Sequence, residues 1–182
     1  MSTWIWIVIA IGAAIVLGIV VAAALRARRT RALRGRFGPE YDRVAADAPT
    51  RREAESELRE REQRREELEI RELPPESRER YFEAWRETQA HFVDDPEEAV
   101  VEADTLIQEV MRARGYPVED FEQRAADISV DHPHVVNNYR AAHGIRTAHD
   151  RGNATTEDLR QALKHYRALF EELLEPERAE SR

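Results

Sequence analysis

Residues 4–25 read WIWIVIAIGAAIVLGIVVAAAL, a run of 22 residues without a charged side chain or a proline. At the rise of an α-helix this run spans roughly 33 Å, which is enough for the hydrocarbon core of a bilayer. A surface helix of a soluble protein keeps a polar face, and this run has none. Trp4 and Trp6 lie at one end, where indole rings favour the headgroup layer. The run predicts a single transmembrane helix.

The charges beside this run predict its orientation. Residues 1–36 contain no acidic side chain and six arginines, all placed after the apolar run: Arg26, Arg28, Arg29, Arg31, Arg34 and Arg36. Because basic residues stay on the cytoplasmic side, residues 1–3 are expected outside the cell and the rest of the chain in the cytoplasm. The first four arginines, with the two tryptophans, form the predicted anchor, and anionic lipid headgroups are its expected partner.

A cleaved signal peptide is the alternative interpretation, and it makes the chain a secreted protein. Ala22, Ala23 and Ala24 supply the small residues of a cleavage site. The run lacks a basic segment in front of it, however, and exceeds the usual length of a signal-peptide core. We therefore favour the membrane anchor.

Small residues recur every four positions within the run, at Ala10, Ala14, Gly18 and Ala22. This spacing puts them on one helix face, where two transmembrane helices can approach closely. It predicts a homodimer formed through the transmembrane helix.

The composition of the chain beyond residue 36 argues against several classes of function. Beyond residue 36 there are 22 basic and 36 acidic side chains, a formal net charge of −14. A domain this acidic repels phosphate backbones, so no nucleic-acid partner is expected. The 182 residues contain no cysteine, which excludes disulfides and thiolate chemistry. The length allows one ordinary domain besides the anchor.

Two connecting segments are expected before the domain. Residues 26–49 are predicted to be a basic juxtamembrane segment and linker, because Gly35, Gly38 and Pro39 interrupt the helix and turn the chain over 35–49. Residues 50–72 begin with a capping pattern, Thr50 followed by Glu53. They are almost entirely charged, with too few apolar positions for a coiled-coil seam. They predict a solvated spacer helix.

Residues 74–175 carry apolar side chains at helical spacing and no credible strand. Pro96, Pro117 and Pro133 are predicted to start helices, and Gly115 to end one. Short connections favour antiparallel neighbours. The fold class is therefore all-α, a transmembrane helix and a charged spacer helix followed by a small antiparallel bundle of about five helices. Residues 176–182 are expected to be a disordered tail.

One cluster raises the question of metal or acid–base chemistry: Asp131, His132 and His134, with His143 further on. His132 precedes a proline and is pushed out of helical geometry. His134 and His143 are nine residues apart and point to opposite helix faces. His143 is expected to pack in the core, and His91 and His165 carry no motif. The first three residues remain weak metal candidates, and a ligand- or metal-binding sensor is the alternative function.

No glycine-rich phosphate loop and no nucleophile motif occurs in the chain. We therefore expect no enzyme activity and no cofactor. The leading hypothesis is a non-enzymatic, membrane-tethered module that binds an unknown protein partner at the cytoplasmic face of the membrane.

Five short runs stand out along the chain: FGPEYD at 37–42, FVDDP at 92–96, RARGYP at 112–117, VDHP at 130–133 and HYRALF at 165–170. Together they resemble an uncharacterised family of actinobacterial membrane-anchored proteins. The resemblance extends over nearly the whole chain. It implies one membrane span followed by helices, and it implies no site residues.

Overall fold

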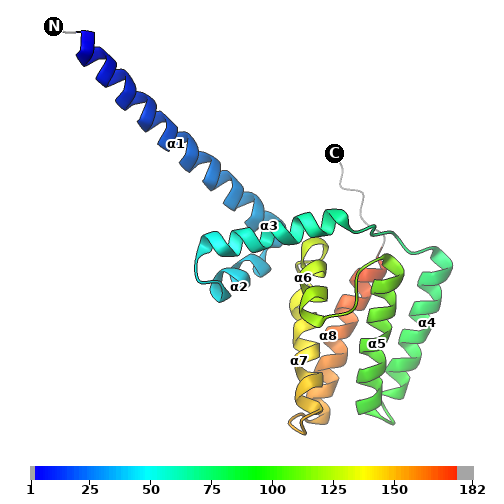
Figure 1. The fold of residues 1–182 in the computed structure, drawn as a ribbon. Coiled ribbons are helices and arrows are strands. Elements are labelled where there is room, and N and C mark those ends of the chain that lie inside the picture. Colours follow the sequence, from blue (N-terminus) through cyan, green and yellow to red (C-terminus); the bar gives the residue numbers. More distant parts are fainter. Residues whose placement is uncertain (1–2, 176–182) are drawn as a thin grey trace.

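The computed structural model describes residues 3–175, and within them it leaves out the side chains of residues 3 and 5–10. The described residues form eight helices and no strand, so the predicted all-α class is confirmed for this part of the chain (Figure 1). The helices are α1 (Thr3–Phe37), α2 (Pro39–Asp47), α3 (Arg51–Glu67), α4 (Pro75–His91), α5 (Pro96–Arg114), α6 (Phe121–Asp131), α7 (Val136–His149) and α8 (Thr156–Leu174).

Helix α1 projects from the rest of the molecule as a single rod (Figure 1). Its residues from Ile11 to Arg29 are exposed. Within the described residues, Ile11–Phe37 is the one segment long and apolar enough to cross a membrane, and a signal sequence meets the same criterion. An apolar N-terminal helix is therefore present. The predicted outer segment 1–3, apart from Thr3, and the predicted tail 176–182 lie outside the described residues.

The prediction of a turned connection over residues 35–49 is wrong. Helix α1 continues through Gly35 to Phe37, and after one break at Gly38 (φ +48°) Pro39 opens α2. A glycine inside a helix costs only about 1 kcal/mol relative to alanine. Here that cost is offset because Leu33 and Phe37 are buried, in one cluster with Tyr41 and Val44 of α2.

Helix α3 differs from the predicted solvated spacer in both length and environment. Thr50 caps it, accepting a hydrogen bond from the Glu53 backbone N–H at 3.2 Å, but it ends at Glu67. Ala54 and Leu58 are fully buried against Phe37 and Tyr41. These two apolar residues are too few for a coiled-coil seam, yet they are enough to place α3 across the end of α1 and α2. We call residues 33–67, which rest on α6, the junction.

Helices α4 to α8, with Leu73 and Tyr116 from the adjoining segments, share a larger core of 22 buried side chains, and we call these five helices the bundle. In Figure 1, α4, α5, α7 and α8 run side by side while the short α6 lies near one end of α7. Trp85 stacks on Phe170 with ring centroids 4.7 Å apart. Apolar burial of this kind, at about 25 cal/mol per Å², is the main stabilising contribution in such a core.

The ends of the bundle helices follow local sequence signals in most places. Asp95 caps α5 by accepting from the Glu98 N–H at 3.1 Å, and α5 ends at Gly115 in the left-handed conformation (φ +100°). Two predicted starts are shifted along the chain. Helix α6 begins at Phe121 because Asp120 is its cap, and α7 begins at Val136 after a turn that follows Pro133.

Candidate functional site: an acidic groove between α4 and α5

Two of the three predicted metal candidates, Asp131 and His132, are engaged by other protein groups. Asp131 accepts from the Tyr116 hydroxyl at 2.6 Å and pairs with Arg65 of α3. His132 lies between Glu172, 3.2 Å from its Nδ1, and Arg114. His134 is exposed. Among the described residues, no three His, Cys, Asp or Glu side chains are arranged to hold a metal ion.

The environment of these groups matches a structural role. Burial lowers the pKa of His132, outweighing the pull of the Glu172 carboxylate in the opposite direction. Burial, and then Asp131, raise the pKa of the Tyr116 phenol, so it stays a hydrogen-bond donor. Together the contacts tie α3 and α8 to the end of α6 and to the turn after α5.

His143 packs against an aromatic ring, but it does not occupy the core position that the sequence predicts. Its ring stacks on Phe121 at a centroid distance of 3.5 Å and an angle of 11°. The side chain is half-buried, and its Nδ1 has no hydrogen-bond partner in the described part of the chain. Burial lowers its pKa, so the neutral ring is favoured in this packing.

The predicted anchor residues lie along α1. Trp4 is 70% exposed, and Arg26, Arg28, Arg29 and Arg31 are exposed on the segment nearer the junction. On the predicted self-association face, Ala14, Gly18 and Ala22 are exposed, and a Cβ added at Gly18 would meet no atom within 4 Å. The side chains of Trp6 and Ala10 lie outside the described part of the molecule.

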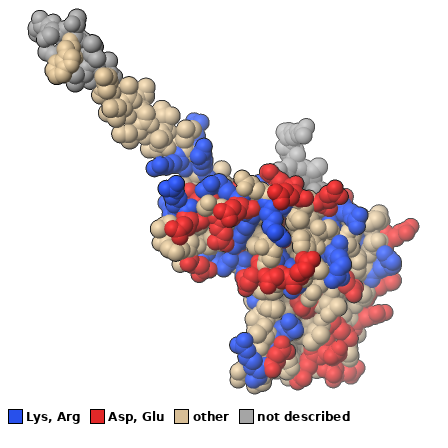
Figure 2. Space-filling view, viewed as in Figure 1, with Lys and Arg blue, Asp and Glu red and all other residues tan. Residues whose placement is uncertain are grey.

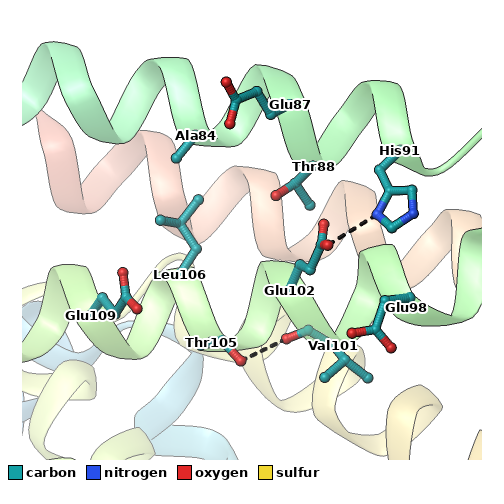
Figure 3. A pocket seen from close by; sticks show the side chains of 10 residues that line it. All are labelled: Ala84, Glu87, Thr88, His91, Glu98, Val101, Glu102, Thr105, Leu106 and Glu109. Carbon is teal, nitrogen blue, oxygen red and sulfur yellow. Dashed lines mark hydrogen bonds and ion pairs between the residues drawn. The ribbon is translucent and has the colours of Figure 1, made fainter.

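A groove of about 600 Å³ lies between α4 and α5 (Figure 3). Its α4 side consists of Ala84, Glu87, Thr88 and His91. Its α5 side consists of Glu98, Val101, Glu102, Thr105, Leu106 and Glu109. On both helices the lining residues recur at three- and four-residue steps, so each helix contributes one continuous face. We call this surface the α4–α5 groove.

The α4–α5 groove combines an apolar floor with an acidic rim. Ala84, Val101 and Leu106 supply apolar surface, and Val101 is 40% exposed. Among the described residues, four glutamates line the groove, and no lysine or arginine does. Its one basic side chain, His91, lies with Nδ1 3.0 Å from Glu102 Oε1, so this pair bridges the two helices (Figure 3).

The sequence contains the two helix faces that line this groove, but it does not show that they pack opposite each other. His91 belongs to no motif, and its partner Glu102 is eleven residues further along on the next helix. A helical-periodicity search aimed at polar rather than apolar positions would have found both faces. It would not have shown that they face each other, since that depends on how α4 and α5 pack.

The groove offers binding surface rather than reactive groups. Thr88 is buried and the Thr105 hydroxyl donates to the Val101 carbonyl at 2.9 Å, so neither is presented as a nucleophile.

Comparisons with protein-family models, with curated proteins and with solved structures found no match to this chain. The resemblance to an actinobacterial family therefore remains an expectation from the sequence.

Proposed function

We propose that this chain is a non-enzymatic, membrane-tethered protein-interaction module, with the junction and the five-helix bundle at the cytoplasmic face. Support for tethering comes from the apolar helix α1, whose residues 11–29 are exposed. Support for the orientation comes from the arginines that follow the apolar run. Secretion after cleavage of a signal peptide remains the alternative.

The module is rigidly attached to its anchor rather than held on a flexible linker. Helix α1 continues without a break from its exposed apolar part to Phe37, which is fully buried in the junction. A continuous helix transmits orientation as well as position. Ion pairs from the junction to α6 and α7 join it to the bundle, so we expect α1 and the bundle to keep a defined relative orientation.

One observation carries the proposal of a partner: in the part of the chain that the structure describes, the lining of the α4–α5 groove has an apolar floor and four glutamates, with no lysine or arginine. The surface that complements it is a basic amphipathic segment, with apolar side chains on one face and lysine or arginine beside them. Each exposed ion pair contributes only about 0.2–1 kcal/mol. The expected complex is therefore reversible and sensitive to salt.

Site-directed photocrosslinking in cells tests this partner. A photoreactive residue at Val101, inside the groove, should give one dominant adduct with the full-length protein. The matched control is Val93, which is 82% exposed and outside the groove. The crosslinked peptide should be basic and amphipathic. An acidic peptide, or equal adducts from both positions, would contradict the proposal.

Charge reversal separates specific docking from chance contact. Glu98→Lys with Glu109→Lys should lower the Val101 adduct by about tenfold or more. The control pair, Glu79→Lys with Glu83→Lys, changes the charge equally on exposed positions of α4 outside the groove, and should leave the adduct unchanged. Extraction at alkaline pH, which releases proteins that do not span the bilayer, tests the anchor separately.

Self-association through Ala10, Ala14, Gly18 and Ala22 is a second part of the proposal. It remains a prediction from their spacing. Gly18→Leu should abolish dimers in detergent, whereas the same change at Gly12, off that face, should not.

A further inference from the structure

A second groove, of about 790 Å³, lies where α1 passes α3. Seven arginines line it: Arg26, Arg29, Arg31 and Arg34 from α1, and Arg51, Arg52 and Arg59 from α3. Of the described residues in the lining, Glu55 is the one that is acidic, so their formal net charge is +6. We call this surface the arginine groove. It is a concentrated positive site on a chain whose net charge is −8.

Glu55 does not neutralise the groove, because its carboxylate is occupied in holding α1 against α3. Its Oε1 accepts from the Thr30 hydroxyl at 2.7 Å and from the Tyr41 hydroxyl at 3.0 Å, and it lies 3.3 Å from Arg51. Burial acts to raise the pKa of Glu55, but these hydrogen bonds and Arg51 outweigh it, and the net pKa is lowered. The carboxylate is therefore a charged clamp between the two helices.

Most of the guanidinium groups in the groove have no such partner. Arg34 lies 3.9 Å from Asp42, and Arg51 pairs with Glu55. In the described part of the chain, five have no carboxylate within ion-pair distance: Arg26, Arg29, Arg31, Arg52 and Arg59. These five are exposed. Several unpaired guanidinium groups facing one hollow favour an anion with more than one oxygen, since each binds phosphate oxygens through paired N–H donors.

The position of the groove identifies the source of that anion. Arg26 directly follows the apolar run, and Arg34 is about 12 Å further along the helix axis. The headgroup layer on each side of the hydrocarbon core is about 5–8 Å thick. The near end of the groove therefore lies at the depth of lipid phosphates, and Ala27 and Leu33 add apolar wall. Figure 2 shows arginines gathered where α1 meets the body and acidic residues over much of the bundle.

A topology signal alone does not account for this arrangement. Basic residues affect orientation when they lie within about 15–20 residues of a span. Arg51, Arg52 and Arg59 lie further along the chain than that, and they reach the groove because α3 folds back across α1. The junction thus adds arginines from a second helix to those beside the span.

We infer that the arginine groove binds the phosphate headgroup of an anionic phospholipid, with the arginines of α1 and α3 acting together. The inference rests on the proposed membrane anchoring. Bound lipid would fix the junction against the membrane surface, while the acidic bundle is held away from it by like charge. A bilayer lipid, rather than a soluble phosphate compound, is the occupant.

Titration of phosphatidylglycerol into full-length protein in neutral detergent micelles tests the inference, with thermal unfolding as the readout. The double variant Arg52→Gln with Arg59→Gln should raise the half-saturating lipid fraction about thirtyfold, since each arginine near the surface contributes about 1 kcal/mol. Neither side chain makes a hydrogen bond or ion pair within the described residues, so the lipid-free unfolding temperature should not change. The charge-preserving pair Arg52→Lys with Arg59→Lys should bind lipid more weakly than the parent but more tightly than the glutamine pair, because lysine keeps the charge and loses the paired N–H donors.

The matched control is Arg86→Gln with Arg112→Gln, which removes two exposed arginines from the bundle. An equal loss in that control would overturn the inference in favour of general charge attraction. Stabilisation by sn-glycerol 3-phosphate as strong as that by the lipid would overturn it in favour of a soluble anion. A protein that alkaline extraction releases from membranes refutes the anchoring. A protein that stays integral, yet binds lipid equally with and without Arg52 and Arg59, refutes only the groove.

Discussion

The junction and the bundle are held together in different ways. The bundle core contains 22 buried apolar side chains, whereas the junction cluster contains seven, six from the junction itself and Val130 from α6. In the junction, ion pairs with buried or half-buried partners supply part of the stabilisation that apolar contacts supply in the bundle. Arg64 pairs with Asp127 at 3.0 Å, and Arg65 pairs with Asp131, so α3 is fastened to α6 by guanidinium–carboxylate contacts.

Glu40 is the centre of the ionic part of the junction. Its carboxylate is fully buried and accepts from Arg61 at 2.8 Å, from Arg140 at 2.7 and 2.9 Å, and from Arg43 at 3.0 Å. Burial acts to raise its pKa, but hydrogen bonds from Arg43, Arg140 and Arg61 outweigh burial, and the net pKa is lowered. One side chain of α2 thus fastens that helix to α3 and to α7.

The largest effect that separates the two regions is expected from Glu40→Gln. The change leaves Arg61, 9% exposed, and Arg140, 16% exposed, without their buried counter-charge. Breaking a buried ionic cluster in this way costs about 3–5 kcal/mol. Hydrogen exchange on the full-length protein should show α2 and α3 losing protection while α5 and α8 keep theirs.

Glu57→Gln is the matched control for that change. Glu57 also pairs with Arg61, but its side chain is 50% exposed, so its loss should cost less than about 1 kcal/mol. Equal effects of the two changes, or a loss of protection spread evenly over junction and bundle, would contradict the difference between the regions.

The same difference determines how much of the fold the sequence predicts. In the bundle, apolar side chains at helical spacing and local caps such as Asp95 and Gly115 indicate each helix, because a helix face and a cap are set within a few residues. In the junction, Glu40 finds partners 21 and 100 positions away. Four-residue spacing favours local partners for the arginines of α3, and Arg61 does pair with Glu57. Arg64, however, binds Asp127, 63 positions away, rather than Glu60.

Candidate sites follow the same rule. Sequence proximity suggested Asp131, His132 and His134, and the fold gives the first two to other partners and leaves His134 at the surface. The α4–α5 groove and the arginine groove each need two helices to meet. How two helices pack against each other is not encoded in the periodicity of either one, so periodicity alone could not predict either groove.

Gly115→Ala tests the contact between the end of α5 and the segment that connects the junction to the bundle. A Cβ at Gly115 would lie 2.4 Å from the backbone oxygen of Glu69, and φ there is +100°. The change strains the end of α5 and pushes away the segment that joins α3 to α4, at an expected cost of about 1–3 kcal/mol in the free energy of unfolding. Thermal or denaturant unfolding measures it.

Substitutions at two other glycines distinguish backbone strain from the steric contact with Glu69 as the cause of that destabilisation. Gly152 has φ +73° with open space around it, so Gly152→Ala reports backbone strain alone. Gly144 lies inside α7 with open space, and Gly144→Ala should stabilise by about 0.5–1 kcal/mol. If Gly115→Ala costs no more than Gly152→Ala, the contact with the α3–α4 segment does not matter.

Acid should affect the bundle before the junction. Burial lowers the pKa of His132 and of His143, so the unfolded chain takes up protons first and the stability these residues contribute falls as pH drops below 6.5, the ordinary histidine value. The pKa of Glu40 is lowered from 4.5, so its contribution is present above that pH and lost as pH falls through the folded-state value. Asp127 opposes this loss, because burial raises its pKa and favours its protonation in the folded state.

Hydrogen exchange as a function of pH tests that order. Between pH 6.5 and 4.5 protection should fall in α6 and α7, and below 4.5 in α2 and α3. The double variant His132→Gln with His143→Gln should flatten the first phase and leave the second. If α2 and α3 lose protection first, the two regions respond to acid in the reverse order.

The smallest expected changes in the free energy of unfolding come from replacing one arginine in each region, Arg167 in the bundle and Arg64 in the junction. Arg167 and Glu171 of α8 are 55% and 50% exposed, so Arg167→Gln should cost about 0.3 kcal/mol. Arg64 is 45% exposed but its partner Asp127 is fully buried, so Arg64→Gln should cost more, about 1 kcal/mol. Added salt should weaken the first pair more than the second, since screening acts on exposed charge. Equal costs and equal salt dependence would mean that the Arg64–Asp127 pair acts as a surface pair, and that other contacts, the buried Arg61–Glu40 pair among them, hold α3 in place.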